Sequence, residues 1–206
     1  GSLGDVTLLS AGSIVDDGIG ATRIQADLLT ADAAGPITMD TRVVSVDLST
    51  SAAGAITLNE FDDITLTDVD TFDGAISVQA GGAVNAVLVD AFDNNGDESH
   101  GVTITTTTGD ITVGAITADG TLTLSTATGS ILDGADDGIP DLAAGGLIML
   151  DAGGGIGGPA GVDGRLDVAA GSVLDVTSTA LGGISLRGAG AMTLQSADTV
   201  DGAIDV

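Results

Sequence analysis

The chain has 206 residues, a formal net charge of −26 and no cysteine, and 43% of its residues are hydrophobic although only 1% are aromatic. Four cationic residues against 30 acidic ones exclude nucleic-acid binding, which requires clustered Lys and Arg to neutralise phosphates. The lack of cysteine, with a single histidine, excludes a disulfide scaffold and argues against a zinc site. The apolar fraction is large enough to form a buried core. The sequence contains no run of about 20 apolar residues, so we predict no membrane insertion.

A short glycine-led motif returns along the chain at a spacing of twenty residues. Residues 54–58 (GAITL) return as residues 74–78 (GAISV). The same spacing separates 109–111 from 129–131, 182–184 from 202–204, Ile64 from Val84, and Leu122 from Leu142. Such internal self-similarity predicts a repeat architecture.

One repeat is longer than the others. The interval from Ile76 to Ile104 is 28 residues, and the eight additional residues fall in the polar stretch 90–100. We therefore expect residues 90–100 to form a loop inserted into one unit.

The sequence also contains a longer repeat, which spans several of the short units. Residues 12–14 recur at 129–131, an offset of 117, and residues 46–78 align without a gap on 174–206, an offset of 128. We interpret residues 1–206 as one continuous segment, with a first supermodule over 1–118 and most of a second over 119–206.

Apolar residues alternate with small polar residues inside each unit. This period of two predicts short strands with one buried and one exposed face, separated by Gly, Asp and Asn that supply turns and positive φ. No segment shows sustained helical periodicity, so we predict an all-β chain. The residues expected to point inward and stack are Ile56, Leu58, Ile76, Val78, Ile111, Val113, Ile131, Ile184, Leu186 and Ile204.

The predicted fold is a single-stranded β-solenoid of about 10 coils with ~20 residues in each coil. A propeller blade needs four strands and about 40 residues, which is twice the observed period. A β-sandwich is the structural alternative, but it gives no reason for a constant twenty-residue register. The scarcity of aromatic residues fits the narrow interior of a solenoid.

Three segments carry a resemblance to a known group of proteins. Residues 12–18 (GSIVDDG), 129–134 (GSILDG) and 150–157 (LDAGGGIG) resemble the repeat regions of giant bacterial surface proteins, namely filamentous-haemagglutinin-like adhesins and autotransporter passengers. The resemblance covers nearly the whole chain at the level of repeat patterning. It implies a right-handed parallel β-helix exported across the outer membrane, with adhesion as the usual role, and the handedness rests on the resemblance alone.

The inserted loop carries oxygen ligands suited to calcium. The predicted Ca²⁺ ligands are Asp93, Asn95, Asp97 and Glu98. They occupy largely alternate positions, as in many calcium loops, but Glu98 stands where the EF-hand motif requires glycine. A solvated acidic turn is therefore the competing interpretation, and the acidic loop 133–141 is a weaker candidate.

The remaining polar residues do not predict catalysis. Adjacent carboxylates such as Asp62 and Asp63 point to opposite faces of a strand, so we interpret them as turn residues. We expect His100 to be an exposed loop residue. The four arginines, Arg23, Arg42, Arg165 and Arg187, are widely spread in the sequence. The Thr-x-Thr segments, as at 103–105 and 121–123, do not recur on every unit, so we interpret them as ordinary outward-facing strand residues. We predict no catalytic residues and no enzyme.

The predicted function is that of a non-enzymatic stalk or fibre segment of a large, secreted or surface-anchored bacterial adhesin-like protein. We expect an extracellular location at the bacterial cell surface, and neighbouring copies or repeats of the same protein as end-to-end partners. The alternative is a binding module that contacts a glycan, a protein or Ca²⁺ through its acidic loops. A polysaccharide-active β-helix enzyme is the weaker alternative, because such enzymes combine carboxylates with cationic side chains and aromatic platforms. We predict neither nucleic-acid binding nor membrane insertion.

Overall fold

The computed structural model describes residues 3–20, 23–91, 100–134, 139–158, 164–179 and 182–206. The described residues form nineteen strands and no helix, so none of them belongs to a helix that could cross a membrane. The strands are β1 Val6–Ser10, β2 Ile14–Val15, β3 Ile24–Ala33, β4 Ile37–Ala53, β5 Ile56–Glu60, β6 Ile64–Asp73, β7 Ile76–Ala80, β8 Val84–Ala91, β9 Val102–Thr106, β10 Ile111–Ala118, β11 Leu122–Thr126, β12 Ile131–Asp133, β13 Leu142–Ala144, β14 Leu147–Ala152, β15 Leu166–Val168, β16 Val173–Ser178, β17 Ile184–Gly188, β18 Thr193–Thr199 and β19 Ile204–Asp205. The prediction of an all-β chain is confirmed.

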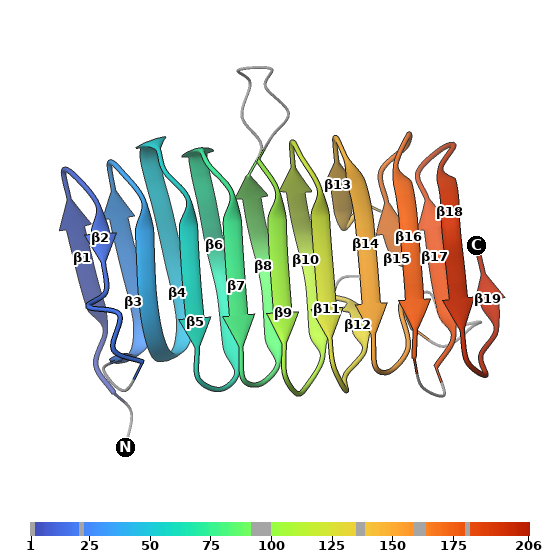
Figure 1. Ribbon diagram of the computed structural model, residues 1–206, viewed down its shortest axis with the longest axis horizontal. Coiled ribbons are helices and arrows are strands. Elements are labelled where there is room, and N and C mark those ends of the chain that lie inside the picture. The colour runs from blue at the N-terminus through green and yellow to red at the C-terminus, as the bar shows by residue number, and fades with distance from the viewer. Residues whose placement is uncertain (1–2, 21–22, 92–99, 135–138, 159–163, 180–181) are drawn as a thin grey trace.

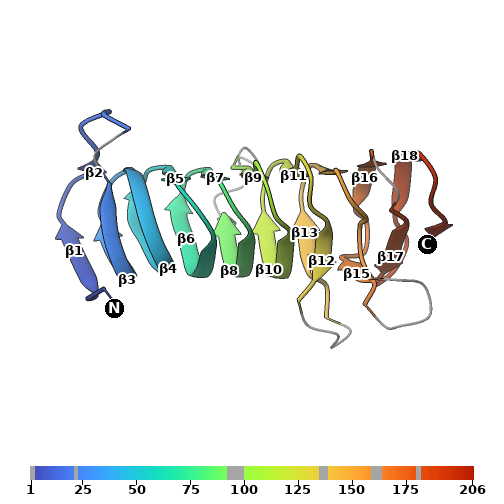
Figure 2. The same ribbon diagram turned by 90° about the horizontal axis from the view of Figure 1, so that it is seen from below.

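The strands pair in parallel along the whole molecule. Figure 1 shows two rows that run in opposite directions, an ascending row that includes β6, β8 and β10 and a descending row that includes β5, β7, β9 and β11. The chain alternates between the rows, and both views show an elongated stack with the termini at opposite ends (Figures 1 and 2). Parallel pairing excludes the antiparallel β-sandwich and is consistent with a β-solenoid.

Much of the twenty-residue spacing is the distance from one coil to the next. Ile56 pairs with Ile76, Ile64 with Val84, Ile111 with Ile131, and Ile184 with Ile204. Equal spacing follows because each residue must meet its partner at a fixed register to maintain the parallel hydrogen bonds.

Two of the equivalences between coils that we inferred from residue spacing are wrong. Leu122 pairs with Ile148 in the descending row, whereas Leu142 pairs with Ile116 in the ascending row. Ile76 pairs with Val102 and not with Ile104, so the longer coil advances 26 residues in place of 28. Both mistakes preserve an alternating apolar pattern, which is why the sequence alone did not reveal them.

The longer offsets match segments from opposite rows. Ile14 pairs with Ile37 in the descending row, whereas Ile131 pairs with Ile111 in the ascending row. The 128-residue offset likewise matches the descending β5 with the ascending β17, which pairs with β15. Each coil contains two similar apolar strands, so sequence similarity does not distinguish the two halves of a coil. The supermodule boundaries at 118 and 119 stay a prediction.

The core is a continuous stack of aliphatic side chains between the two rows. Nine of the ten predicted core residues are at most 1% exposed, and the tenth, Ile204, is 46% exposed. Ile204 lies in β19, which pairs on one side with β17 and has no further described strand on its other side. The core prediction is therefore confirmed except at the C-terminal end of the stack.

Glycine occurs at many coil corners because the neighbouring backbone leaves no space for a side chain. A Cβ on Gly74 would overlap the Gly54 carbonyl oxygen, and one on Gly129 would overlap the Gly109 carbonyl oxygen. Neither Gly74 nor Gly129 has a positive φ, in contrast to Gly109. Close stacking, more than the expected positive φ, therefore explains the glycine-led motif at these corners.

Candidate functional site

The predicted calcium ligands lie outside the described residues. Asp93, Asn95, Asp97 and Glu98 belong to the segment 92–99. The calcium site therefore stays a prediction. Within the part of the chain that the structure describes, no group of three or more His, Asp or Glu residues is placed to hold a metal ion.

His100 is partly buried, so the expectation of an exposed loop residue is wrong. Its side chain is 15% exposed, and its Nε2 atom lies 3.1 Å from the Asp73 Oδ1 atom. The His100 carbonyl oxygen also accepts a hydrogen bond from the Gly120 backbone N–H at 2.8 Å. His100 thus joins adjacent coils next to the segment 92–99, a role that the sequence did not indicate.

The second acidic loop ends in a structural aspartate. Asp141 is 2% exposed, and its Oδ2 atom accepts a hydrogen bond from the Asp167 backbone N–H at 2.7 Å. Asp167 is also buried and forms an ion pair with Arg187. These described carboxylates hold coils together through hydrogen bonds and an ion pair.

The adjacent carboxylates Asp62 and Asp63 have separate structural partners. Asp62 Oδ2 accepts a hydrogen bond from Arg42 Nε at 3.0 Å, and Asp63 Oδ1 accepts one from the Ala83 backbone N–H at 2.8 Å. This arrangement matches their interpretation as turn residues. Another adjacent pair, Asp136 and Asp137, lies outside the described residues.

Buried hydroxyls at the coil corners were not singled out in the sequence. Thr71 Oγ1 donates to the Gly74 carbonyl oxygen at 2.5 Å, and Thr126 Oγ1 donates to the Gly109 carbonyl oxygen at 2.8 Å. The Gly129 backbone N–H donates to Thr126 Oγ1 at 2.9 Å. A threonine three residues before a glycine is the signal that could have identified these corners.

Glu60 is a buried acid at the end of β5. Its Oε2 atom accepts hydrogen bonds from Thr41 Oγ1 at 2.8 Å and from the Val43 backbone N–H at 3.1 Å. Its Oε1 atom accepts from the backbone N–H groups of Phe61 and Asp62. Burial raises the pKa of Glu60, while the hydrogen bond from Thr41 opposes that shift. Glu60 therefore organises the chain at the corner that precedes β6.

Aspartates gather on the outer side of the ascending row. In the parallel register, Asp47 lies opposite Asp68, and Asp70 lies opposite Asp90. Burial, followed by the neighbouring charges of Asp68 and Asp90, raises the pKa of Asp70 to about 6. The stacking of coils thus concentrates negative charge that the linear sequence distributes over several units.

Hydroxyl side chains form one column on the descending row. The members, in register from coil to coil, are Thr38, Thr57, Ser77, Thr103 and Thr123. The adjacent column contains Asn59 and Gln79 opposite Thr105. The Thr-x-Thr form therefore does not recur on every coil, which agrees with the sequence analysis.

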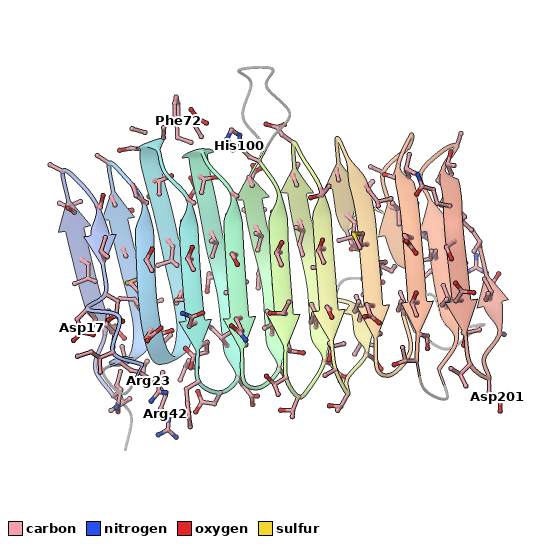
Figure 3. The ribbon with its side chains drawn as sticks, in the orientation of Figure 1. Asp17, Arg23, Arg42, Phe72, His100 and Asp201 are labelled. Carbon is pink, nitrogen blue, oxygen red and sulfur yellow. The ribbon has the colours of Figure 1, made fainter. Side chains whose placement is uncertain are left out.

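Two of the four arginines meet at one aromatic ring, contrary to their spread in the sequence. The Phe61 cluster consists of Arg23, Arg42 and Phe61. The guanidinium carbon lies 4.5 Å from the ring centroid in Arg23 and 5.4 Å in Arg42. Figure 3 shows both arginines at the lower edge of the rod, toward its N-terminal end. Their spacing of nineteen residues along the chain, close to one coil, is the signal that could have identified the cluster.

Comparisons of the chain with protein-family models, curated proteins and solved structures give no match. The continuous stack of coils and the side chains arranged along its surface are therefore the features from which a function can be inferred.

Proposed function

We propose that the chain is a non-enzymatic stalk or fibre segment of a large, secreted or surface-anchored bacterial adhesin-like protein. The observation that carries this proposal is the parallel pairing that connects each coil to the next, from β1 to β19, around one core. A stack in which each coil contacts its neighbours extends in one direction as coils are added. Such a rod suits the task of holding a distal domain away from a cell surface.

The finer architecture belongs to the same proposal. We infer about 10 coils of ~20 residues in a single-stranded, right-handed parallel β-helix. With ~4.8 Å between paired strands, the rod is roughly 50 Å long. Small-angle X-ray scattering tests the length, and an experimental structure tests the handedness.

The acidic exterior supports an extracellular location. A net charge of −26 produces repulsion along the rod that dissolved salt screens over a Debye length of ~8 Å at physiological ionic strength. Many acidic residues, such as Asp16 and Asp17 beside Gly18, accept hydrogen bonds from nearby backbone N–H groups. The composition therefore combines turn formation with a surface suited to a saline environment.

End-to-end association is the partner interaction that we propose. Among the described strands, β1 pairs with β3 alone and β19 pairs with β17 alone, so each has one open edge. An open parallel edge is a template for another strand. Light scattering should detect growing assemblies, and a polar cap fused to each end should suppress them.

A charge at the open end sharpens this test. Ile204→Lys places a charge at the end of the stack and should reduce assembly. Val44→Lys is the matched control, because Val44 is 63% exposed in β4, which has paired strands, β3 and β6, on both sides. Equal assembly of the capped and uncapped chains would contradict the end-to-end partner.

Ligand screening separates the stalk from the binding-module alternative. A module acting through its inserted loop should give saturable binding on a glycan array that is lost when 92–99 are replaced by a short Gly-Ser turn, whereas a stalk segment should give no binding that depends on this loop. For calcium, millimolar Ca²⁺ should raise the melting temperature, and the double change Asp93→Ala, Asp97→Ala should remove most of that rise. Equal stabilisation by NaCl at matched ionic strength would indicate screening alone.

A further inference from the structure

We propose that the Phe61 cluster and the neighbouring cavity bind a small acidic sugar. The cavity has a volume of about 340 Å³, and its lining includes Arg23, Asn59, Phe61, Gln79 and Thr107. This volume is at the lower end of the ~300–1,000 Å³ range typical of small-molecule sites, which suits one or two sugar units. The site lies on the side of the rod and does not depend on the stalk proposal.

Arg23 supplies a cation that is available to a ligand. It forms no ion pair within the described part of the chain, whereas Arg42 is engaged with Asp62 at 3.0 Å. The Phe61 ring attracts the Arg23 guanidinium through a cation–π contact, and this contact leaves the guanidinium N–H groups free to donate. A guanidinium binds a carboxylate through paired charge-assisted hydrogen bonds.

Two acids also line the cavity, but both have donors within the protein. Asp40 Oδ1 accepts a hydrogen bond from Asn59 Nδ2 at 2.9 Å. Glu60 is 5% exposed and accepts hydrogen bonds from Thr41 and from three backbone N–H groups. Their negative charge disfavours a ligand that is only a carboxylate, so additional contacts are needed to hold an anion here.

Neutral polar side chains provide those contacts. Gln79 is exposed, and its amide forms no hydrogen bond within the described residues. Asn59 and Thr107 line the same cavity. Amide and hydroxyl groups donate to and accept from sugar hydroxyls, while Arg23 takes the sugar carboxylate. This combination favours a uronic acid over a neutral sugar or a simple carboxylate.

The test compares three probes on the intact chain. Galacturonate, galactose and acetate are titrated separately while ¹⁵N-labelled protein is followed by NMR. Galacturonate should bind most tightly, with shifts centred on residues 59–61 and 79, and should weaken as salt is added. Arg23→Gln should reduce its affinity at least tenfold, because a charge-assisted pair is lost.

Matched variants separate the site from general charge effects. Arg165→Gln removes the same charge near the other end of the stack, where Arg165 pairs with Asp205, and should leave affinity unchanged. Phe61→Leu should weaken galacturonate binding through loss of the cation–π contact even if Arg23→Gln impairs folding. The proposal would be overturned if galactose or acetate bound with the same affinity as galacturonate. It would also be overturned if Arg23→Gln and Arg165→Gln changed the affinity for galacturonate equally.

Discussion

The same motif is buried in the middle of the rod and exposed at its C-terminal end. Residues 74–78 (GAISV) and 202–206 (GAIDV) share four of five residues. Ile76 is 1% exposed and Ile204 is 46% exposed, although both alternate with polar neighbours. β7 pairs with β5 and β9, whereas β19 pairs with β17 on one side. Local alternation therefore selects the inward face, and coils on both sides complete the burial.

The largest expected effect comes from placing a charge at each copy of the motif. Ile76→Asp buries an unpaired carboxylate and should lower the free energy of unfolding by about 3–5 kcal/mol. Ile204→Asp leaves the carboxylate in contact with water and should cost less than about 1 kcal/mol. Urea unfolding at pH 7 measures both, and equal losses would contradict the role assigned to the second neighbouring coil.

Adding one methyl group at a coil corner should have the next largest effect. Gly74→Ala forces a Cβ against the Gly54 carbonyl oxygen and should cost about 2–3 kcal/mol. Gly202→Ala meets the Gly182 carbonyl in the same way, but the last coil can shift, so its cost should be smaller. Gly12→Ala is the control, since the nearest atom to the new Cβ is Ser10 Oγ at 4.0 Å. Thermal unfolding of the three variants should follow this order.

The corner hydroxyls sharpen the comparison further. Thr71→Val removes the hydrogen bond to the Gly74 carbonyl oxygen and should cost about 1 kcal/mol. Thr199 makes a related contact near the end, where its Oγ1 donates to the carbonyl oxygen of Gly182, seventeen residues earlier, at 2.7 Å. Thr199→Val should cost less, because water can reach that carbonyl. Calorimetric melting of both variants, with exposed Thr67→Val as control, checks the difference.

The smallest expected effect is a pH dependence from the aspartates of the ascending row. The pKa of Asp70 is about 6 in the folded chain, above its ordinary value of 3.8, so the folded state binds this proton more tightly than the unfolded state. The resulting stability is present below pH ~4 and is lost as pH rises through ~6. Solvent screening limits the loss to about 1 kcal/mol.

Asp70→Asn should remove this part of the pH dependence and raise the melting temperature at pH 7. Asp201→Asn removes the same formal charge from an exposed position near the C-terminal end, and is the control. Melting curves between pH 4 and pH 7 test the pair. If the melting temperature of Asp70→Asn depends on pH as steeply as that of the unaltered chain, the charges of this row do not act through Asp70.

The sequence by itself determined the all-β class and most of the core. Alternation with a period of two selects one inward face, and a constant coil length preserves the register of parallel strands, so residues such as Ile56 and Ile111 could be placed inside. The sequence did not separate the two halves of a coil, because both contain glycine-led apolar strands. The twenty-residue spacing of Leu122 and Leu142 consequently relates residues from opposite rows.

Only the tertiary structure decided which polar side chains meet. Arg23, Arg42 and Phe61 lie on successive turns of the chain, and stacking brings them to one ring. Glu60 is buried and His100 is partly buried, because neighbouring coils supply Thr41 and Asp73 as their partners. Hydrophobic periodicity indicates which face of a strand points inward, but it does not indicate the position at which a coil turns. The polar contacts depend on that position, so they became visible only when the coils were stacked.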